Sequence, residues 1–136
     1  MKPIFFAFFL FFIIFFTSGC SAGNPERDID IDMTILSPTM VSAQGFRITS
    51  SPEAHVGYTM RIQGSYFTFH WEEADMQLHY VVLDLTAGCC GQAFEFKYNG
   101  ELPEMGTPIK ITGVFSYYEI MGEVYFYISV TEWVEI

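Results

Sequence analysis

The chain has 136 residues, 51% of them hydrophobic, with 16 acidic against 6 basic side chains and a formal net charge of −10. This length fits one domain that can bury a core of its own, so disulfides are not needed for stability. A charge of this sign repels nucleic acid phosphates and anionic headgroups, which excludes a nucleic acid partner and favours cationic partners.

The first element in chain order is a short apolar run behind a single basic residue. Lys2 precedes Ile4 to Phe16, a stretch of 13 apolar residues. A membrane-spanning helix needs about 20 such residues, so this run is too short to be a typical span. A positive start, an apolar centre and a small-residue exit predict an export signal over residues 1–19.

The exit of this signal reads Thr17-Ser18-Gly19-Cys20. It resembles the lipobox of bacterial lipoproteins, in which small residues precede a cysteine that is diacylated and becomes the new N-terminus. The resemblance implies that Cys20 is a lipid anchor, since two acyl chains hold a protein stably on a membrane. The mature chain is then the 136 residues less 19, or 117, on the extracytoplasmic face of the cell membrane. The alternatives are an ordinary secretory signal or a short membrane helix, with Cys20 incidental.

Residues 20–36 are expected to be the lipid anchor and an acidic tether. Asp28, Asp30 and Asp32 alternate with isoleucine in a small, polar stretch. Carboxylate oxygens suit Ca²⁺, but the stretch lacks the glycine and the distal glutamate of an EF-hand loop. We therefore favour a solvated spacer over a calcium site.

A short helix of about ten residues is expected next, beginning near Ser37, including Met40, Val41, Ala43 and Phe46, and ending before Pro52. A Ser/Thr start is followed by apolar residues at roughly helical spacing, and Pro52 follows its end. Beyond Pro52 the apolar residues recur every second position, which predicts strands.

Two of these strands echo each other at an offset of 49 residues. Gly57–Tyr66 and Gly106–Phe115 both read Gly, two spacers, apolar, basic, Ile, polar, Gly, one spacer, aromatic. The alternation predicts an inward face made of Met60, Ile62, Ile109 and Ile111. Glycines inside strands mark bends or bulges, which a small barrel requires.

Three further strands are predicted over Met76–Leu85, Ala93–Tyr98 and Val124–Trp133. In the last two, alternation points one set of apolar residues inward, namely Phe94, Phe96, Tyr98, Val124, Phe126, Ile128 and Val130. Five strands, with bends in the first and fourth, predict a mainly β domain over residues 37–136. Its expected form is a five-stranded OB-like β-barrel, with the N-terminal helix at its end.

The motif order also shows a family resemblance. The chain runs Thr39-Met40-Val41, G-x-x-M-x-I-x-G, D-x-T-A-x-C-C-x-Q, G-x-x-I-x-I-x-G-x-F and an aromatic final strand. This order resembles a family of small, uncharacterised lipoproteins of Gram-positive anaerobes with an OB-like domain. It is similar also to the C-terminal OB-like part of permease-associated bacterial membrane proteins that carry a cysteine pair. The resemblance implies a fold and an envelope location, without an activity.

Cys89 and Cys90 lie between glycines, at the predicted turn between the second and third strands. If Cys20 is acylated, they are the only thiols left. One interpretation is a structural turn, with the thiols buried or joined in a vicinal disulfide. A second is a zinc or copper site with His55, which the expected strand pairing places beside them, and with Asp84 or Glu53 as outer ligands. A third is thiol redox exchange.

Aromatic side chains suggest a binding platform on the same strands. We expect Phe69, Trp71 and Tyr80 to lie near Tyr125 and Tyr127, since OB barrels bind ligands along the second and third strands. Trp71 leads into an acidic stretch over residues 72–75, which is expected to be a solvated loop and, secondarily, a contact for a cationic partner. Sheet stabilisation is the simpler role for such rings.

No nucleophile, metalloprotease or phosphate-binding motif occurs in the chain. The sequence therefore favours a non-enzymatic binding or accessory module of the cell envelope, tethered to the membrane, with an envelope protein or a cationic molecule as its partner and no cofactor. The alternative is a metal-binding or metal-relay lipoprotein that uses Cys89 and Cys90, and a thiol-redox protein is the third reading.

Overall fold

The structure is a computed structural model that describes residues 28–83 and 91–136. The expected export signal, the anchor at Cys20 and the pair Cys89 and Cys90 lie outside these residues.

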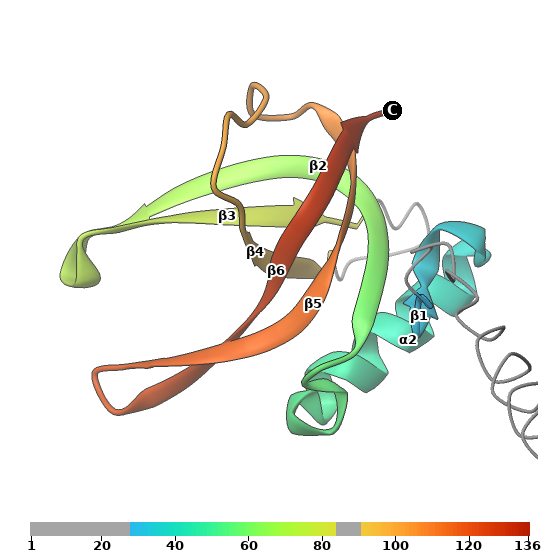
Figure 1. Ribbon diagram of the computed structural model, residues 1–136, viewed down its shortest axis with the longest axis horizontal. Coiled ribbons are helices and arrows are strands. Elements are labelled where there is room, and N and C mark those ends of the chain that lie inside the picture. Colours follow the sequence, from blue (N-terminus) through green and yellow to red (C-terminus); the bar gives the residue numbers. More distant parts are fainter. Residues whose placement is uncertain (1–27, 84–90) are drawn as a thin grey trace, which may run out of the picture.

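The described chain is mainly β, with one α-helix, as the sequence predicts (Figure 1). The helix α2 spans Pro38–Ser50, and short 3₁₀ turns are η2 (Met33–Ile35), η3 (Pro52–His55) and η4 (Glu72–Ala74). The strands are β1 (Ile31–Asp32), β2 (Thr59–Trp71), β3 (Met76–Val82), β4 (Ala93–Lys97), β5 (Pro108–Ile120) and β6 (Glu123–Glu135). All six belong to one sheet, which is one strand more than predicted, because β1 adds to the edge of β2.

The sheet order is β1-β2-β3-β4-β6-β5, and β2 also pairs with β5, so the pairings of the five longer strands return to their start. One link in this cycle is short, since β4 and β6 pair in parallel only through Phe96 with Ile128 and Lys97 with Ser129. All the other pairings within the cycle are antiparallel.

The two echoing segments pair with each other. Ile62 lies opposite Ile111, its own equivalent at the offset of 49, and Met60 lies opposite Gly113. A Cβ atom on Gly64 would lie 2.2 Å from the carbonyl oxygen of Val82, and one on Gly113 would lie 2.3 Å from that of Ser129. Both glycines are therefore required by close backbone contacts, and a bulge in the β5–β6 pairing lies between Thr112 and Gly113.

The core confirms the predicted alternation of the echoing strands. Met60, Ile62, Ile109 and Ile111 are all fully buried. The buried cluster is completed by Ile31, Met33, Ile48, Tyr66, Val81, Leu83, Phe94, Phe96, Phe115, Ile128 and Val130.

One expected core residue lies at the surface. Val124 is 50% exposed, whereas Ile128 and Val130 are buried as predicted. Val124 pairs with Glu119 near the tip of the β5–β6 hairpin, where no further strand pairs with β6 among the described residues. The alternation of apolar and polar residues continues to Val124, but this side chain does not contribute to the buried core.

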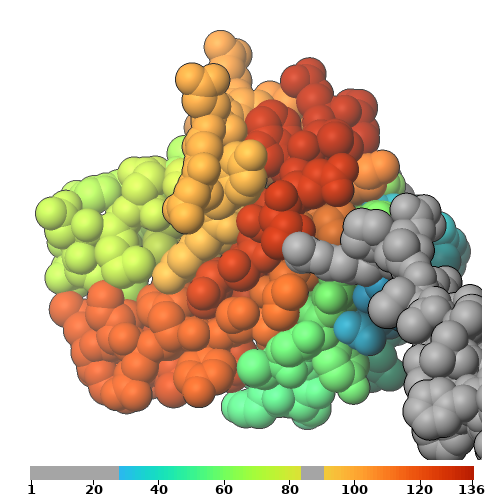
Figure 2. Space-filling view, in the orientation of Figure 1, coloured from blue at the N-terminus to red at the C-terminus, as the bar shows by residue number. Residues whose placement is uncertain are grey.

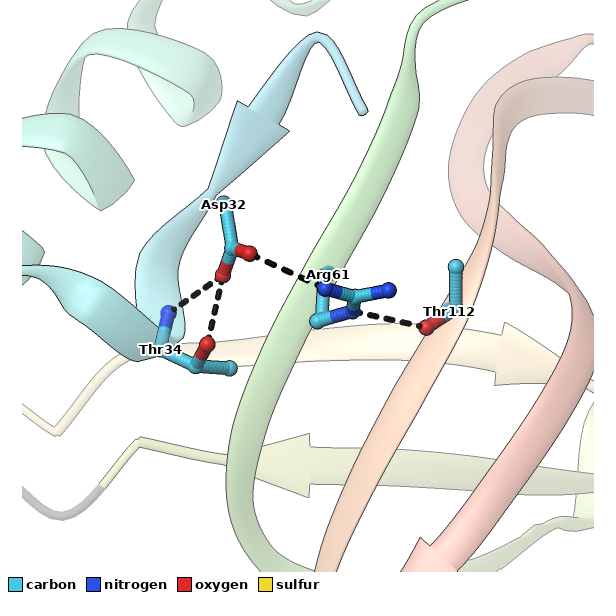
Figure 3. Close-up of polar contacts among 4 residues, drawn as sticks. All are labelled: Asp32, Thr34, Arg61 and Thr112. Carbon is cyan, nitrogen blue, oxygen red and sulfur yellow. Dashed lines mark hydrogen bonds and ion pairs between the residues drawn. The ribbon is translucent and has the colours of Figure 1, made fainter. Parts of the chain in front are cut away.

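The folded part begins earlier than residue 37. Ile31 and Met33 are 7% and 2% exposed and belong to the core, so the stretch from Ile31 is not a free tether. The prediction was wrong here because the neighbouring aspartates are not solvated but contact residues of β2. The backbone N–H of Thr59 donates to Asp30 at 2.8 Å, and Asp32 forms an ion pair with Arg61 at 3.2 Å (Figure 3).

Asp32 is also the N-cap of η2. Its carboxylate accepts hydrogen bonds from the backbone N–H and the hydroxyl of Thr34, at 3.0 and 2.6 Å. Burial alone would raise the pKa of Asp32, but these hydrogen bonds and the positive charge of Arg61 outweigh it and lower the pKa. Asp30 and Asp32 thus attach the N-terminal segment to β2.

Helix α2 begins with Pro38 in its first turn and ends at Ser50, before Pro52, as expected, and its 13 residues are slightly more than the ten or so predicted. Gly45 is buried within it and Ile48 is fully buried in the core, so α2 covers one end of the β-structure (Figure 1). Between α2 and β4 to β6 remains a small cavity, lined by Ile48, Thr49, Pro52, Ala93, Phe94, Glu95, Phe115 and Phe126.

Candidate binding surface

Two hairpins extend beyond the rest of the sheet and lie side by side (Figures 1 and 2). They are built from β2 with β3 and from β5 with β6. Near their tips the ring of Trp71, at the end of β2, packs against Tyr125 of β6 with centroids 5.4 Å apart. This contact joins two segments that are 54 positions apart in the chain.

A second group of rings continues from Tyr125. Tyr118 of β5 lies opposite Tyr125 and stacks on it at 5.5 Å, and the edge of Tyr127 meets Tyr118 at 5.7 Å. The ammonium of Lys97, on β4, lies 3.6 Å from the ring centre of Tyr118 and 4.5 Å from that of Tyr127. Such distances are typical of cation–π interactions.

A buried carboxylate lies under these rings. Glu95 is 8% exposed, and the hydroxyl of Tyr118 donates to its Oε2 at 3.1 Å. Its Oε1 is buried without a hydrogen-bond partner among the described residues. Tyr80 of β3 lies opposite Glu95 in the β3–β4 pairing. A buried acceptor without a donor lowers the stability of the fold, and such atoms are rare in native proteins.

Burial raises the pKa of Glu95 above its ordinary value, and the Tyr118 hydrogen bond and the charge of Lys97 offset only part of this effect. Burial and the neighbouring Glu95 also raise the pKa values of Tyr80 and Tyr118. Both phenols therefore stay protonated near neutral pH and remain hydrogen-bond donors.

Acidic side chains surround the aromatic cluster. The tip of the β2–β3 hairpin carries Glu72, Glu73 and Asp75, and the tip of the β5–β6 hairpin carries Glu119 and Glu123. All five are exposed, as the sequence predicts for the first three. We call the rings of Trp71, Tyr80, Tyr118, Tyr125 and Tyr127, with Glu95, Lys97 and these five carboxylates, the hairpin surface.

The predicted aromatic platform is largely brought together. Trp71, Tyr125 and Tyr127 belong to one connected set of rings, and Tyr80 adjoins it through Glu95. Phe69 is 58% exposed and lies two residues before Trp71 on β2, outside the ring contacts of this set.

Sequence reasoning missed Tyr118, Glu95 and Lys97. The inward assignment of Phe94 and Phe96 already implied that Glu95 and Lys97 point the other way. Their importance depends on Tyr118, which comes from a strand more than 20 positions later, so alternation alone could not reveal it.

The metal hypothesis expected the end of β3 to lie beside His55, and the pairings of the described strands do not bring the two together. The start of β2 pairs with β5, and the end of β3 reaches only to Ser65, where Val82 lies opposite. The last described pair of β3 therefore lies opposite Ser65, ten residues after His55. His55 is buried at 7% exposure, its Nδ1 donates to the carbonyl oxygen of Ser51 at 2.9 Å, and its ring packs against Tyr58.

Within residues 28–83 and 91–136, no three His, Cys, Asp or Glu side chains lie close enough to hold a metal ion.

The other two histidines contact side chains elsewhere on the sheet. His79 Nδ1 lies 2.8 Å from the Tyr66 hydroxyl, and burial lowers its pKa. His70 Nε2 lies 3.6 Å from Asp75 at the hairpin tip.

No helix in the described part of the chain is long and apolar enough to cross a bilayer. No family model matches the chain, and the comparison with curated proteins finds no match.

Proposed function

We propose that this protein is a non-enzymatic binding module, held on the extracytoplasmic face of the cell membrane by a lipid on Cys20. Its fold is an OB-like barrel with one extra edge strand, and its partner is a cationic segment of an envelope protein. The observation that carries the proposal is the hairpin surface, where aromatic rings and exposed carboxylates meet at the tips of two hairpins.

The strand pairings support the OB-like assignment. In an OB barrel, five strands close in a Greek-key order and ligands bind across the second and third strands, between the loops that follow the first and the fourth. Here β2 to β6 would be strands one to five, and the two hairpin tips would be these two loops. Trp71 and Tyr125 lie at that position.

The chemistry of the hairpin surface favours a cationic partner. Arginine and lysine side chains are attracted to the faces of Trp and Tyr rings, and Lys97 already makes such a contact within the protein. The five exposed carboxylates add a negative field, which raises association rates and selects against acidic partners. The same field makes an oligonucleotide, which is a common ligand of OB folds, a poor candidate.

Binding of a cationic peptide tests this proposal. We would titrate the intact chain in detergent with a hexa-arginine peptide at low salt, and follow the fluorescence of Trp71 by comparing the native chain with Trp71→Phe. We expect a saturable change that weakens as salt is raised, because exposed charges are screened. A hexa-citrulline peptide, which has the same shape without the charge, should not bind.

A matched pair of charge variants locates the interaction. Glu72→Gln with Glu73→Gln removes two carboxylates from the hairpin tip, whereas Glu101→Gln with Glu104→Gln removes two exposed carboxylates from the connection between β4 and β5. We expect the first pair to weaken binding about fivefold to tenfold and the second to change it far less, since nearby pairs dominate at moderate salt. Equal losses in both pairs would show attraction to net charge alone and would contradict the proposed site.

A further inference from the structure

Helix α2 carries exposed apolar side chains on the side opposite its core contacts. Phe46 is 68% exposed and Met40 is 55% exposed, while Ile48 is fully buried on the other side. Met40, Ala43 and Phe46 are spaced three residues apart, so they lie next to each other along the helix. We call the exposed side chains of Met40, Ala43, Phe46 and Arg47 the α2 face.

The charge of this segment differs from that of the rest of the chain. Residues 33–52 contain no Asp or Glu, although the whole chain has 16, and Arg47 is the only charged side chain among them. A protein of net charge −10 is repelled by an anionic bilayer over most of its surface. The α2 face is apolar and weakly basic, so it is the region that can lie against such a bilayer at least cost.

The position of the N-terminal end of the fold brings this face near the membrane. Asp28 follows Cys20 by eight residues, and a fully extended residue spans at most about 3.6 Å, so a lipid on Cys20 keeps Asp28 within about 29 Å of the surface. From Asp28 the chain passes through β1 and η2 directly into α2, and β1 and α2 lie at the same end of the molecule (Figure 1).

We propose that the α2 face is a membrane-contact surface, with Met40 and Phe46 inserted at the boundary between the lipid headgroups and the acyl chains and Arg47 beside anionic phosphates. This inference rests on the proposed attachment at Cys20 and adds an orientation to it. The hairpin tips lie at the far side of the molecule from β1 and α2 (Figure 1), so contact through the α2 face turns the hairpin surface away from the bilayer, toward envelope partners.

Quenching by brominated lipids tests this orientation. The full acylated chain, with Trp71→Phe and Trp133→Phe, would carry either Phe46→Trp or, as a matched control, Phe69→Trp. Both positions are exposed phenylalanines, one on α2 and the other on the β2–β3 hairpin. The chains would be reconstituted in vesicles of phosphatidylglycerol and phosphatidylcholine, with or without bromine on the acyl chains, and recovered by flotation.

We expect the tryptophan at position 46 to show blue-shifted emission, most of which is lost in brominated vesicles, and the tryptophan at position 69 to be unaffected. If the chain floats but position 46 is not quenched, the attachment stands and the α2 contact is wrong. A blue shift without quenching would mean that a second copy covers the face, which also overturns the inference. A chain that does not float would remove the attachment itself, and the inference would fall with it.

Discussion

Glu95 is the residue whose environment most clearly conflicts with its chemistry. Its carboxylate is buried, one oxygen has no partner among the described residues, and its pKa is raised. An acid whose pKa is higher in the folded state binds more protons there than in the unfolded state. Its contribution to stability therefore decreases as the pH rises from its ordinary pKa of 4.5 through the raised value.

We expect Glu95→Gln to flatten this dependence. The amide oxygen can still accept the hydrogen bond from Tyr118, and the charge that burial disfavours is gone. Relative to the native protein, the variant should gain stability between pH 4.5 and pH 7, as measured by urea unfolding at the two pH values. Glu119→Gln, which changes an exposed carboxyl on β5, is the control. A loss of stability that is the same at both pH values would contradict this account.

At the scale of the element, the bend of β2 depends on the absence of a side chain at one position. A Cβ atom on Gly64 would lie 2.2 Å from the carbonyl oxygen of Val82, which is closer than any van der Waals contact permits. Gly64→Ala must therefore push β2 and β3 apart, and we expect a loss of about 1–3 kcal/mol or more in the free energy of unfolding. Gly91→Ala, where no atom of the described residues beyond its chain neighbours lies within 4 Å of the added carbon, should leave stability nearly unchanged. If the two variants lost the same amount of stability, the close contact with Val82 would not be the reason for a glycine at position 64.

The N-terminal segment is a second element whose role can be measured. Met33 is 2% exposed and lies in the core, whereas Ile35, two residues later, is 79% exposed. We expect Met33→Ala to lower the free energy of unfolding by roughly 2–5 kcal/mol, and Ile35→Ala to change it by less than about 0.5 kcal/mol. Thermal or urea unfolding of the two variants would measure both values. If Met33→Ala were as mild as Ile35→Ala, the segment would be a tether after all.

These elements show what sequence pattern could and could not reveal. Strict alternation placed Ile62 and Ile111 in the core correctly, because both lie in long strands with a neighbour on each side. The segment around Met33 was misjudged, since its polar residues looked solvated and the partner of Asp32, Arg61, lies 29 positions away. Local composition does not contain a contact of that range. The burial of Glu95 was missed for the same reason, because it depends on Tyr118.

At the scale of the whole molecule, the α2 face and the hairpin surface differ in chemistry. The end with β1 and α2 includes a stretch without carboxylates, and the far side carries the hairpin tips with their five exposed acidic residues (Figure 1). Such an arrangement suits a protein attached to a surface at one end and free to bind at the other. The proposed attachment at Cys20 and the proposed hairpin surface would thus lie at different ends of the molecule.

The most direct test of this account is the mass of the N-terminal peptide of the full chain, expressed in a bacterium and purified from its membranes. We expect residues 1–19 to be absent and Cys20 to carry a diacylglycerol group, and we expect Cys20→Ser to lose both the lipid and the membrane association. Cys89→Ser with Cys90→Ser is the control and should keep both. A chain that retains residues 1–19, or that begins at another residue without lipid, would contradict the central claim.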